Sequence, residues 1–303
     1  MLGLWVLLSV WMGSMAFVTV GLVAFVLIPA TRAYILVFVL VYYGTRPLIP
    51  LRRSQTAVAW FTHVNATHYF HKQALVREDP TPIPPASKTM LAYHPHGILC
   101  CGWSVHGAMH ASWTSSNISW LVADVLFKLP FVSNAMSWGG CSSAAKRNFE
   151  GLMKQGENIA LLPGGFQEAT LYAKGEHRLF LHQRTGFIKY GLQYGYKVVP
   201  VYNFGEEHTY HAMSSFLGVR LWLNQFQLPG AVPFGTWWCA YMPLTSAELT
   251  TVVGKPIQLP HIENPTRDDV AKYHKIYVDA LQDLFERNKA KYAADPKATL
   301  HVY

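Results

Sequence analysis

Residues 88–97 read KTMLAYHPHG, a largely apolar run as far as position 93 that leads directly into two histidines separated by a proline. Residues 158–162 and 197–204 are similar apolar runs, and glycine follows each within two positions. Runs of this length predict buried strands. A helical pattern at 185–194 lies between the second and third of these runs, and another at 265–285 comes after the third. Strands that alternate with helices predict a layered α/β fold, in which helices flank a central sheet.

The flanking segments predict further elements. Residues 55–72 have a helical pattern with an aromatic stripe, and 250–259 is a candidate strand. Ser142 or Ser143 is a suitable first residue for a helix that reaches Lys154. Thr266, followed by acidic residues, is typical of a helix start. We find no internal repeat, and the body of the chain is predicted to be one α/β domain.

The polar residues at the predicted strand ends form a candidate active site. His94 and His96 follow the first strand, Gly164 and Gly165 follow the second, and Glu168 comes soon after. Histidine accepts a proton near neutral pH, and a carboxylate bonded to its second nitrogen fixes the tautomer. Adjacent glycines allow close approach to the backbone or offer N–H groups to an oxyanion. Each motif taken alone also fits a core histidine or a glycine turn; their combination favours catalysis.

The composition indicates a membrane protein. Of the 303 residues, 51% are hydrophobic and 14% are charged, against about 25% charged in typical globular chains. The net charge of +8 suits anionic lipid head groups or phosphorylated substrates. Clusters of Lys and Arg, which nucleic-acid binding requires, are absent, so no nucleic-acid partner is expected. The four cysteines have no CxxC spacing and no disulfide-framework pattern, which indicates a reducing compartment.

The amino-terminal region is predicted to be a membrane anchor. Residues 1–31 contain no charged side chain and are long enough to cross a bilayer core. A second apolar run, 33–43, is too short to span alone, so Pro29 predicts either an embedded hydrophobic hairpin or one span plus an interfacial segment. Three arginines between 46 and 53 place the exit on the cytosolic side. We expect an anchor over 1–50, an amphipathic helix and proline-rich linker over 51–87, and the main domain over 88–303.

The 14 histidines also allow a metal-dependent interpretation. Three pairs have the three- or four-residue spacing of the histidine boxes in membrane desaturases and hydroxylases: His68 and His71, His106 and His110, and His208 and His211. The adjacent histidine pairs and supporting carboxylates of such sites are missing. We therefore predict no metal site. A histidine-box lipid desaturase or hydroxylase stays as the alternative of a different class.

Five blocks, in order along the chain, resemble the type-2 diacylglycerol acyltransferase family, which includes monoacylglycerol and wax-alcohol acyltransferases. The HPHG of residues 94–97 is similar to the signature of that family. The other blocks are LPGG with QEA in 162–169, RTGFIK in 184–189, VPVYNFGE in 199–206, and VVGKPI in 252–257 with the helix after it. The resemblance covers residues 88–292, and it implies a layered glycerolipid-acyltransferase-like domain preceded by a membrane-embedded hydrophobic hairpin.

The resemblance implies acyl transfer from acyl-CoA to a lipid hydroxyl. Diacylglycerol, which would become triacylglycerol, is the first acceptor expected, with monoacylglycerol or a long-chain alcohol as alternatives. The general base is His96 or His94; we favour His96, with His94 orienting or structural and Glu168 holding the second nitrogen of the base. The residues expected to shape the substrate site are Pro95, Gly97, Pro163, Gly164 and Gly165.

Acyl-CoA enters as a co-substrate, and no further cofactor is expected. Arg184 and Lys189, with Lys146 and Arg147 behind them, are the expected partners of the CoA phosphates; a solvated basic rim is the alternative. Cys100 and Cys101 lie in no nucleophile motif, so no covalent acyl-enzyme is required. The family likeness also implies the endoplasmic reticulum membrane or a lipid-droplet surface, with the catalytic domain in the cytosol, and leaves a homodimer open.

One segment departs from the family pattern. Between Gly205 and Val252 the family usually has a Gly-Arg-Gly element, and this chain has PFGTWWC at 233–239 instead. Residues 216–241 are unusually aromatic, which predicts a membrane-dipping surface or part of an acceptor tunnel, with core packing as the alternative. Because this segment is expected to meet the acceptor, the identity of the acceptor stays open.

Overall fold

The computed structural model describes residues 2–49, 52–64, 68–213, 215–226 and 230–303. Its strands are β1 (Lys72–Arg77), β2 (Thr89–His94), β3 (Ser119–Val122), β4 (Cys141–Ser143), β5 (Ile159–Leu161), β6 (His177–Leu179), β7 (Lys197–Phe204), β8 (His211–Ala212), β9 (Pro233–Phe234), β10 (Glu248–Val253), β11 (Ile257–Gln258) and β12 (Leu300–Val302). Its α-helices are α1 (Leu2–Leu27), α2 (Arg32–Thr45), α3 (Gln55–His63), α4 (Val132–Trp138), α5 (Lys146–Lys154), α6 (Gly165–Leu171), α7 (Gly186–Tyr194), α8 (Leu217–Leu223) and α9 (Arg267–Tyr292).

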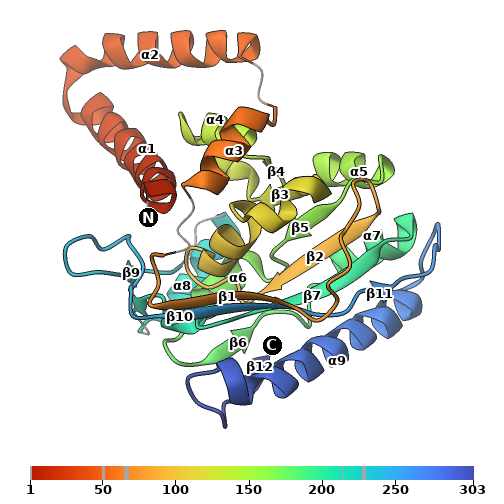
Figure 1. Ribbon diagram of the computed structural model, residues 1–303. Helices are drawn as coiled ribbons and strands as arrows, with labels where there is room; N and C mark the ends of the chain where they lie inside the picture. Colours follow the sequence, from red (N-terminus) through yellow and green to blue (C-terminus); the bar gives the residue numbers. More distant parts are fainter. Residues whose placement is uncertain (1, 50–51, 65–67, 214, 227–229) are drawn as a thin grey trace.

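A mixed sheet forms the centre of the fold, in the order β1-β10-β7-β2-β5-β3-β4 (Figure 1). From β7 to β4 neighbouring strands are parallel, and His94 at the end of β2 pairs with Tyr202 of β7. Strand β10 runs antiparallel to β7, and β1 runs parallel to β10. The carboxyl ends of β2, β5 and β7 therefore meet at one edge, where α/β sheets commonly place their reactive groups.

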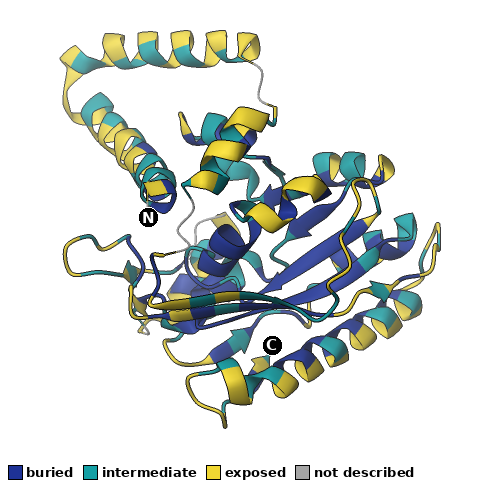
Figure 2. Ribbon diagram, in the orientation of Figure 1, coloured by how far each residue is buried: buried dark blue, intermediate teal, exposed yellow. Residues whose placement is uncertain are grey.

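Helices cover both faces of this sheet, whose central strands β2 and β7 are almost wholly buried (Figure 2). Helices α5, α7 and α9 share one apolar cluster with β7, in which Tyr202, Phe204 and Phe285 are fully buried. A second cluster on the other face joins Tyr93 to the tryptophans of the segment after β2. The prediction of an α/β fold with a central sheet flanked by helices is confirmed.

The amino-terminal helices extend away from this sheet (Figure 1). By length and composition, α1 is able to cross a membrane. It ends where Pro29 begins a short 3₁₀ turn, and the Arg32 guanidinium then donates to the carbonyls of Phe25 and Val26, which the helix end leaves free. Helix α2 contacts α1 through Phe17 and Phe38, whose ring centroids are 5.1 Å apart. The division of the chain into an anchor (1–50), a helix with a linker (51–87) and a main domain (88–303) stays a prediction. Positions 50–51 lie outside the described residues.

Several expected elements differ from the structure. The helix expected over 55–72 ends at His63, and its last residue instead begins the edge strand β1; positions 65–67 lie outside the described residues. The strand expected over 250–259 is two strands, since Pro256 interrupts it and has no N–H to donate. Ser142 and Ser143 belong to β4, and α5 begins only at Lys146. The Ser143 hydroxyl accepts from the N–H of Ala145, just before that helix.

Candidate active site

The loop after β2 places His96 in a partly open position with one ring nitrogen unprotonated. Its Nδ1 lies 3.0 Å from the Gly97 carbonyl oxygen. Because a carbonyl only accepts hydrogen bonds, Nδ1 carries the proton, and Nε2 is left with its lone pair. Burial lowers the pKa of His96 below its usual range, so the ring is neutral near pH 7. A neutral imidazole with an unprotonated Nε2 is competent as a general base.

His94 has a different environment, since its side chain is fully buried. Its Nε2 is 2.9 Å from the hydroxyl of Tyr277 on α9, and its Nδ1 has no hydrogen-bond partner. Burial lowers the pKa of His94 to about 3. The ring is therefore neutral, and the 4.0 Å between Nδ1 and Glu168 Oε1 is not an ion pair. Enclosure on all sides leaves His94 without access to a substrate and suits it to supporting the loop.

Glu168 binds the loop through its backbone, which differs from the role expected for it. Its Oε1 accepts the backbone N–H of His96 at 2.7 Å, and its Oε2 accepts that of Phe180 at 3.2 Å. The imidazole of His96 turns to Gly97 instead, because the left-handed φ of +61° at Gly97 brings the carbonyl within reach. Burial raises the pKa of Glu168 to about 8. This carboxyl is thus largely protonated at pH 7 and positions His96 without ion pairing.

A second buried carboxylate, Glu206, holds the other end of this loop. Its oxygens accept the backbone N–H groups of Cys101 and Gly102 at 2.9 and 2.7 Å. Gly97 packs so closely against Glu206 that a Cβ there would overlap the carboxylate. The loops after β2, β5 and β7 are therefore joined by Glu168 and Glu206. In the sequence, Glu206 is only the last residue of the VPVYNFGE block, and Tyr277 has no signal beyond helical spacing.

Pro163, Gly164 and Gly165 form the turn between β5 and α6. A Cβ on Gly164 would overlap the carboxylate of Glu168, so the missing side chain lets α6 close over that group. Gly165 has a φ of +56°, and no atom lies within 4 Å of the position that a Cβ would take. The backbone at Gly165 is therefore open to a ligand, whereas Gly164 is occupied with Glu168. Pro95 and Gly97 are buried in the loop after β2.

Of the four basic residues expected at the CoA phosphates, one lies next to α6 and three lie on helices α5 and α7. Arg184 lies next to the active-site helix: its guanidinium binds the Gln167 side chain of α6 and stacks 5.3 Å from the Phe180 ring. Lys189, on α7, and Lys146 are exposed. Helices α5 and α7 pack together through Phe149 and Tyr190, 5.2 Å between centroids.

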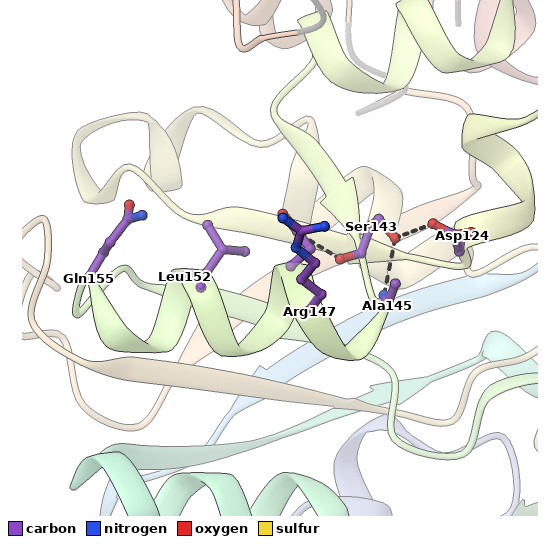
Figure 3. A pocket seen from close by; sticks show the side chains of 8 residues that line it. Asp124, Ser143, Ala145, Arg147, Leu152 and Gln155 are labelled. Carbon is purple, nitrogen blue, oxygen red and sulfur yellow. Dashed lines mark hydrogen bonds between the residues drawn. The ribbon is translucent and has the colours of Figure 1, made fainter.

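Arg147 lines a separate pocket of about 440 Å³ that runs along α5 from Ser143 to Gln155 (Figure 3). The same pocket is bounded by Asp124, whose carboxylate accepts from the Ser143 hydroxyl at 2.6 Å. The structure therefore brings Arg184 to the catalytic loops and places Arg147 on a neighbouring surface. It shows no direct contact that joins these two arginines among the residues it describes.

Cys100 lies beside the candidate base. Its Sγ is 3.4 Å from Nδ1 and 3.5 Å from Nε2 of His96. Burial, followed by the nearby Glu206 and Glu168, raises the pKa of this thiol well above its usual range. A protonated thiol is a weak nucleophile, so Cys100 does not provide a thiolate next to the histidine.

The paired histidines of the sequence gather around another cavity. A cavity of about 1410 Å³ is lined by His68, His71, His106, His110 and His208. Within the part of the chain that the structure describes, no group of three or more His, Cys, Asp and Glu side chains is placed to hold a metal ion. His106 bonds through Nδ1 to the Thr251 hydroxyl at 2.8 Å. Its environment is that of a buried structural imidazole.

Tyr277→Phe is expected to lower the free energy of unfolding by about 1–3 kcal/mol, because the buried His94 loses its hydrogen-bond partner. Tyr93→Phe is the matched control, since the Tyr93 hydroxyl is buried without a partner and its removal is expected to be neutral or stabilising. Chemical unfolding of both variants in detergent measures the difference. If Tyr277→Phe were no less stable than Tyr93→Phe, the bond to His94 would contribute nothing to the free energy of unfolding.

The stability of Glu206→Gln relative to the unmodified protein is expected to improve as the pH rises. Burial raises the pKa of Glu206 to about 7 from an ordinary value of 4.5. Between these values the folded protein retains a proton that the unfolded chain releases, so this glutamate makes folding less favourable with increasing pH. Glutamine has no such dependence. Unfolding midpoints at pH 5 and pH 8 give the comparison, with exposed Glu248→Gln as control; a gap that is constant with pH would contradict the raised pKa.

Comparisons with known proteins show the family of this chain. The family model of diacylglycerol acyltransferase matches residues 25–303. Acyl-CoA wax alcohol acyltransferase 2 of Homo sapiens is 30% identical over 272 residues, 83% of this chain and 80% of the relative. Diacylglycerol O-acyltransferase 2 of Dictyostelium discoideum is 33% identical over 240 residues, covering 72% and 71%. The crystal structure of a 1-acyl-sn-glycerophosphate acyltransferase from Thermotoga maritima covers 78% of this chain and 81% of its own, with a TM-score of 0.48 and 13% identity. The chain belongs to the diacylglycerol acyltransferase family.

Proposed function

We propose that this protein transfers a fatty acyl group from acyl-CoA to the hydroxyl of diacylglycerol, with His96 as the general base. Membership of the family supports the acyl-CoA-dependent O-acyltransferase activity and favours it over histidine-box chemistry. The observation that carries the mechanism is the neutral His96 ring, whose Nδ1 lies 3.0 Å from the Gly97 carbonyl while Nε2, with only the Cys100 thiol at 3.5 Å, keeps its lone pair. Acyl-CoA is the co-substrate, and the proposed reaction requires no other cofactor.

The reaction proceeds by direct displacement. His96 Nε2 takes the proton of the acceptor hydroxyl as its oxygen attacks the thioester carbonyl. The tetrahedral intermediate collapses, the C–S bond breaks, and the proton on His96 passes to the departing CoA sulfur. Atoms and charge balance without an acyl-enzyme. Glu168 and Glu206 keep the His96 loop in place through backbone N–H groups.

The remaining site residues are assigned to binding. The open backbone at Gly165 is suited to contact the thioester oxygen as its charge develops. Arg184, next to α6, is assigned to the phosphate of CoA nearest the thioester, because guanidinium binds phosphate in a bidentate manner. Lys189, Lys146 and Arg147, on the adjacent helices α5 and α7, are assigned to the more distant phosphates.

The identity of the lipid that accepts the acyl group is a separate part of the proposal. The relatives are named for diacylglycerol, for wax alcohols and for 2-acylglycerol, so monoacylglycerol and a long-chain alcohol are the alternatives. We assign the protein to the endoplasmic reticulum membrane or a lipid-droplet surface, with the catalytic domain in the cytosol. The apolar helix α1 supports attachment to a membrane.

A parallel acceptor assay tests this assignment. Membranes that contain the protein are given labelled oleoyl-CoA with dioleoylglycerol, monooleoylglycerol or hexadecanol at equal surface concentration. We expect triacylglycerol to form fastest. A higher rate with hexadecanol or monooleoylglycerol would replace the acceptor but keep the chemistry, and label in none of the three esters would contradict the proposal.

A further inference from the structure

The most exposed apolar side chains of the catalytic domain lie in one segment that the reaction does not use. We call residues 215–226 and 230–242 the aromatic segment. Trp237 is 96% exposed and Phe216 is 75% exposed. The other large apolar side chains exposed in the segment are Leu217, Val219, Trp222, Phe226, Val232, Phe234 and Trp238. A surface of this kind on a folded domain marks a protein or membrane contact.

The aromatic segment exposes no charge. Between positions 212 and 247 the sequence has a single charged residue, Arg220, and this side chain is buried. Its Nε donates to the Gly230 carbonyl at 2.5 Å and its Nη2 to the Thr170 carbonyl at 2.8 Å. Rims of polar and charged side chains usually surround the apolar centre of a protein–protein interface. The absence of exposed charge over so long a stretch favours a lipid surface.

The aromatic segment is continuous with the candidate membrane helix. Trp238 stacks on Trp5 of α1 with 5.2 Å between ring centroids, and Tyr241 meets the same tryptophan edge-on at 6.4 Å. The hydroxyls of Ser9 and Tyr241 are 3.4 Å apart. Figure 1 shows the loop at β9 beside the amino-terminal end of α1. A bilayer that receives α1 therefore also meets this loop.

The aromatic segment is also tied to the active site. Helix α8 is fastened to α6 by the bond from Arg220 to the Thr170 carbonyl. The Thr170 hydroxyl is 3.0 Å from Asn224 Oδ1 and 2.8 Å from the Phe166 carbonyl. Thr170 lies two residues after Glu168 on the same short helix. These hydrogen bonds thus join the aromatic segment to the helix whose Glu168 positions the His96 loop.

We infer that the aromatic segment is a second membrane-docking surface, which inserts its tryptophans and phenylalanines into the lipid interface beside α1. Tryptophan is favoured at that depth because its ring is apolar and its N–H is polar. Docking brings helix α6, which carries Glu168, towards the lipid surface that supplies a membrane-borne acceptor. The docking itself is independent of the proposed function; its effect on the acceptor rests on that function.

Photocrosslinking tests the docking. The full-length protein carries p-benzoylphenylalanine in place of Trp237 and is reconstituted in phosphatidylcholine vesicles that contain labelled lipid. We expect lipid label on the protein after irradiation, and none when the same group replaces Lys275, an exposed residue of α9. Crosslinks between two copies of the chain, or equal lipid labelling at 237 and 275, would overturn the inference. This readout does not depend on enzymatic activity.

Kinetics test the link to the acceptor. Trp237→Ser together with Phe216→Ser is expected to raise the KM for dioleoylglycerol in vesicles several-fold, and to leave the rate with a short-chain diacylglycerol in detergent unchanged. Ile276→Ser, at an exposed apolar residue of α9 outside the aromatic segment, is the matched control. Equal loss with both acceptors would indicate structural damage and overturn the link. If the unmodified protein makes no ester at all, the proposed function fails while the crosslinking result still decides the docking.

Discussion

Replacing His96 with alanine is expected to lower kcat for acyl transfer by about 10²- to 10⁴-fold, the usual contribution of a positioned general base. Nε2 of His96 is the ring nitrogen left to accept a proton, since Nδ1 is 3.0 Å from the Gly97 carbonyl. Alanine removes that acceptor but keeps the backbone N–H that Glu168 binds, so the loop is preserved. Initial rates at saturating oleoyl-CoA and dioleoylglycerol, per mole of folded protein, measure the effect.

Cys100→Ala is the matched control for this experiment. The thiol touches the same imidazole but is protonated, because burial raises its pKa. We expect the variant to keep most of its kcat. A loss as large as that of His96→Ala would indicate a thiol nucleophile and an acyl-enzyme. A full rate in His96→Ala would remove His96 as the base.

Gly164→Ala is expected to have a large effect on folding. The added methyl group would overlap the carboxylate of Glu168 and come within 2.6 Å of its Cβ. Neither group has room, because Glu168 is buried and bonded to two backbone N–H groups. Overpacking of this kind costs about 1–3 kcal/mol or more. We therefore expect a clear fall in unfolding midpoint and a loss of activity at the temperature where the unmodified protein works.

The neighbouring glycine provides the control. At Gly165 no atom lies within 4 Å of an added Cβ, and only the φ of +56° opposes alanine, at about 1–2 kcal/mol. Gly165→Ala is therefore expected to fold better than Gly164→Ala. Thermal unfolding of the two variants in the same detergent gives the order. The reverse order would show that the close approach of Gly164 to Glu168 does not limit folding.

The bounds of the central strands β2, β5 and β7 could be predicted from the sequence because apolar runs and glycine turns are local signals. Strand β7 has the expected bounds, and β2 and β5 lie within one or two residues of theirs. Strand β1 was missed because its residues, KQALVR, alternate weakly and follow an aromatic helix. As an edge strand its half-exposed positions resemble those of an amphipathic helix.

The arrangement within the site could be predicted only in part. Histidine, glycine and glutamate residues at neighbouring strand ends were expected to converge, and the structure brings them together. Which group meets which depends on backbone conformation: the φ at Gly97 directs the His96 ring to a carbonyl, and leaves Glu168 to the N–H. Tyr277 lies 183 positions from His94. Contacts at such separation arise from tertiary packing and leave no local pattern.

One imidazole and two carboxyl groups buried near the His96 loop are wholly or partly uncharged. His94 is neutral because burial lowers its pKa, and Glu168 and Glu206 are largely or partly protonated because burial raises theirs. The loop is thus held by hydrogen bonds with little net charge behind His96. Such an environment keeps the base neutral before it takes the proton of the acceptor.

The most direct measurement follows both products of the reaction in one vessel. Purified protein in phosphatidylcholine vesicles with dioleoylglycerol is given labelled oleoyl-CoA, and labelled triacylglycerol and free CoA are counted over time. We expect one triacylglycerol for each CoA released, and almost no release with His96→Ala. CoA released without ester, or equal ester formation by the variant, would contradict base-assisted acyl transfer at His96.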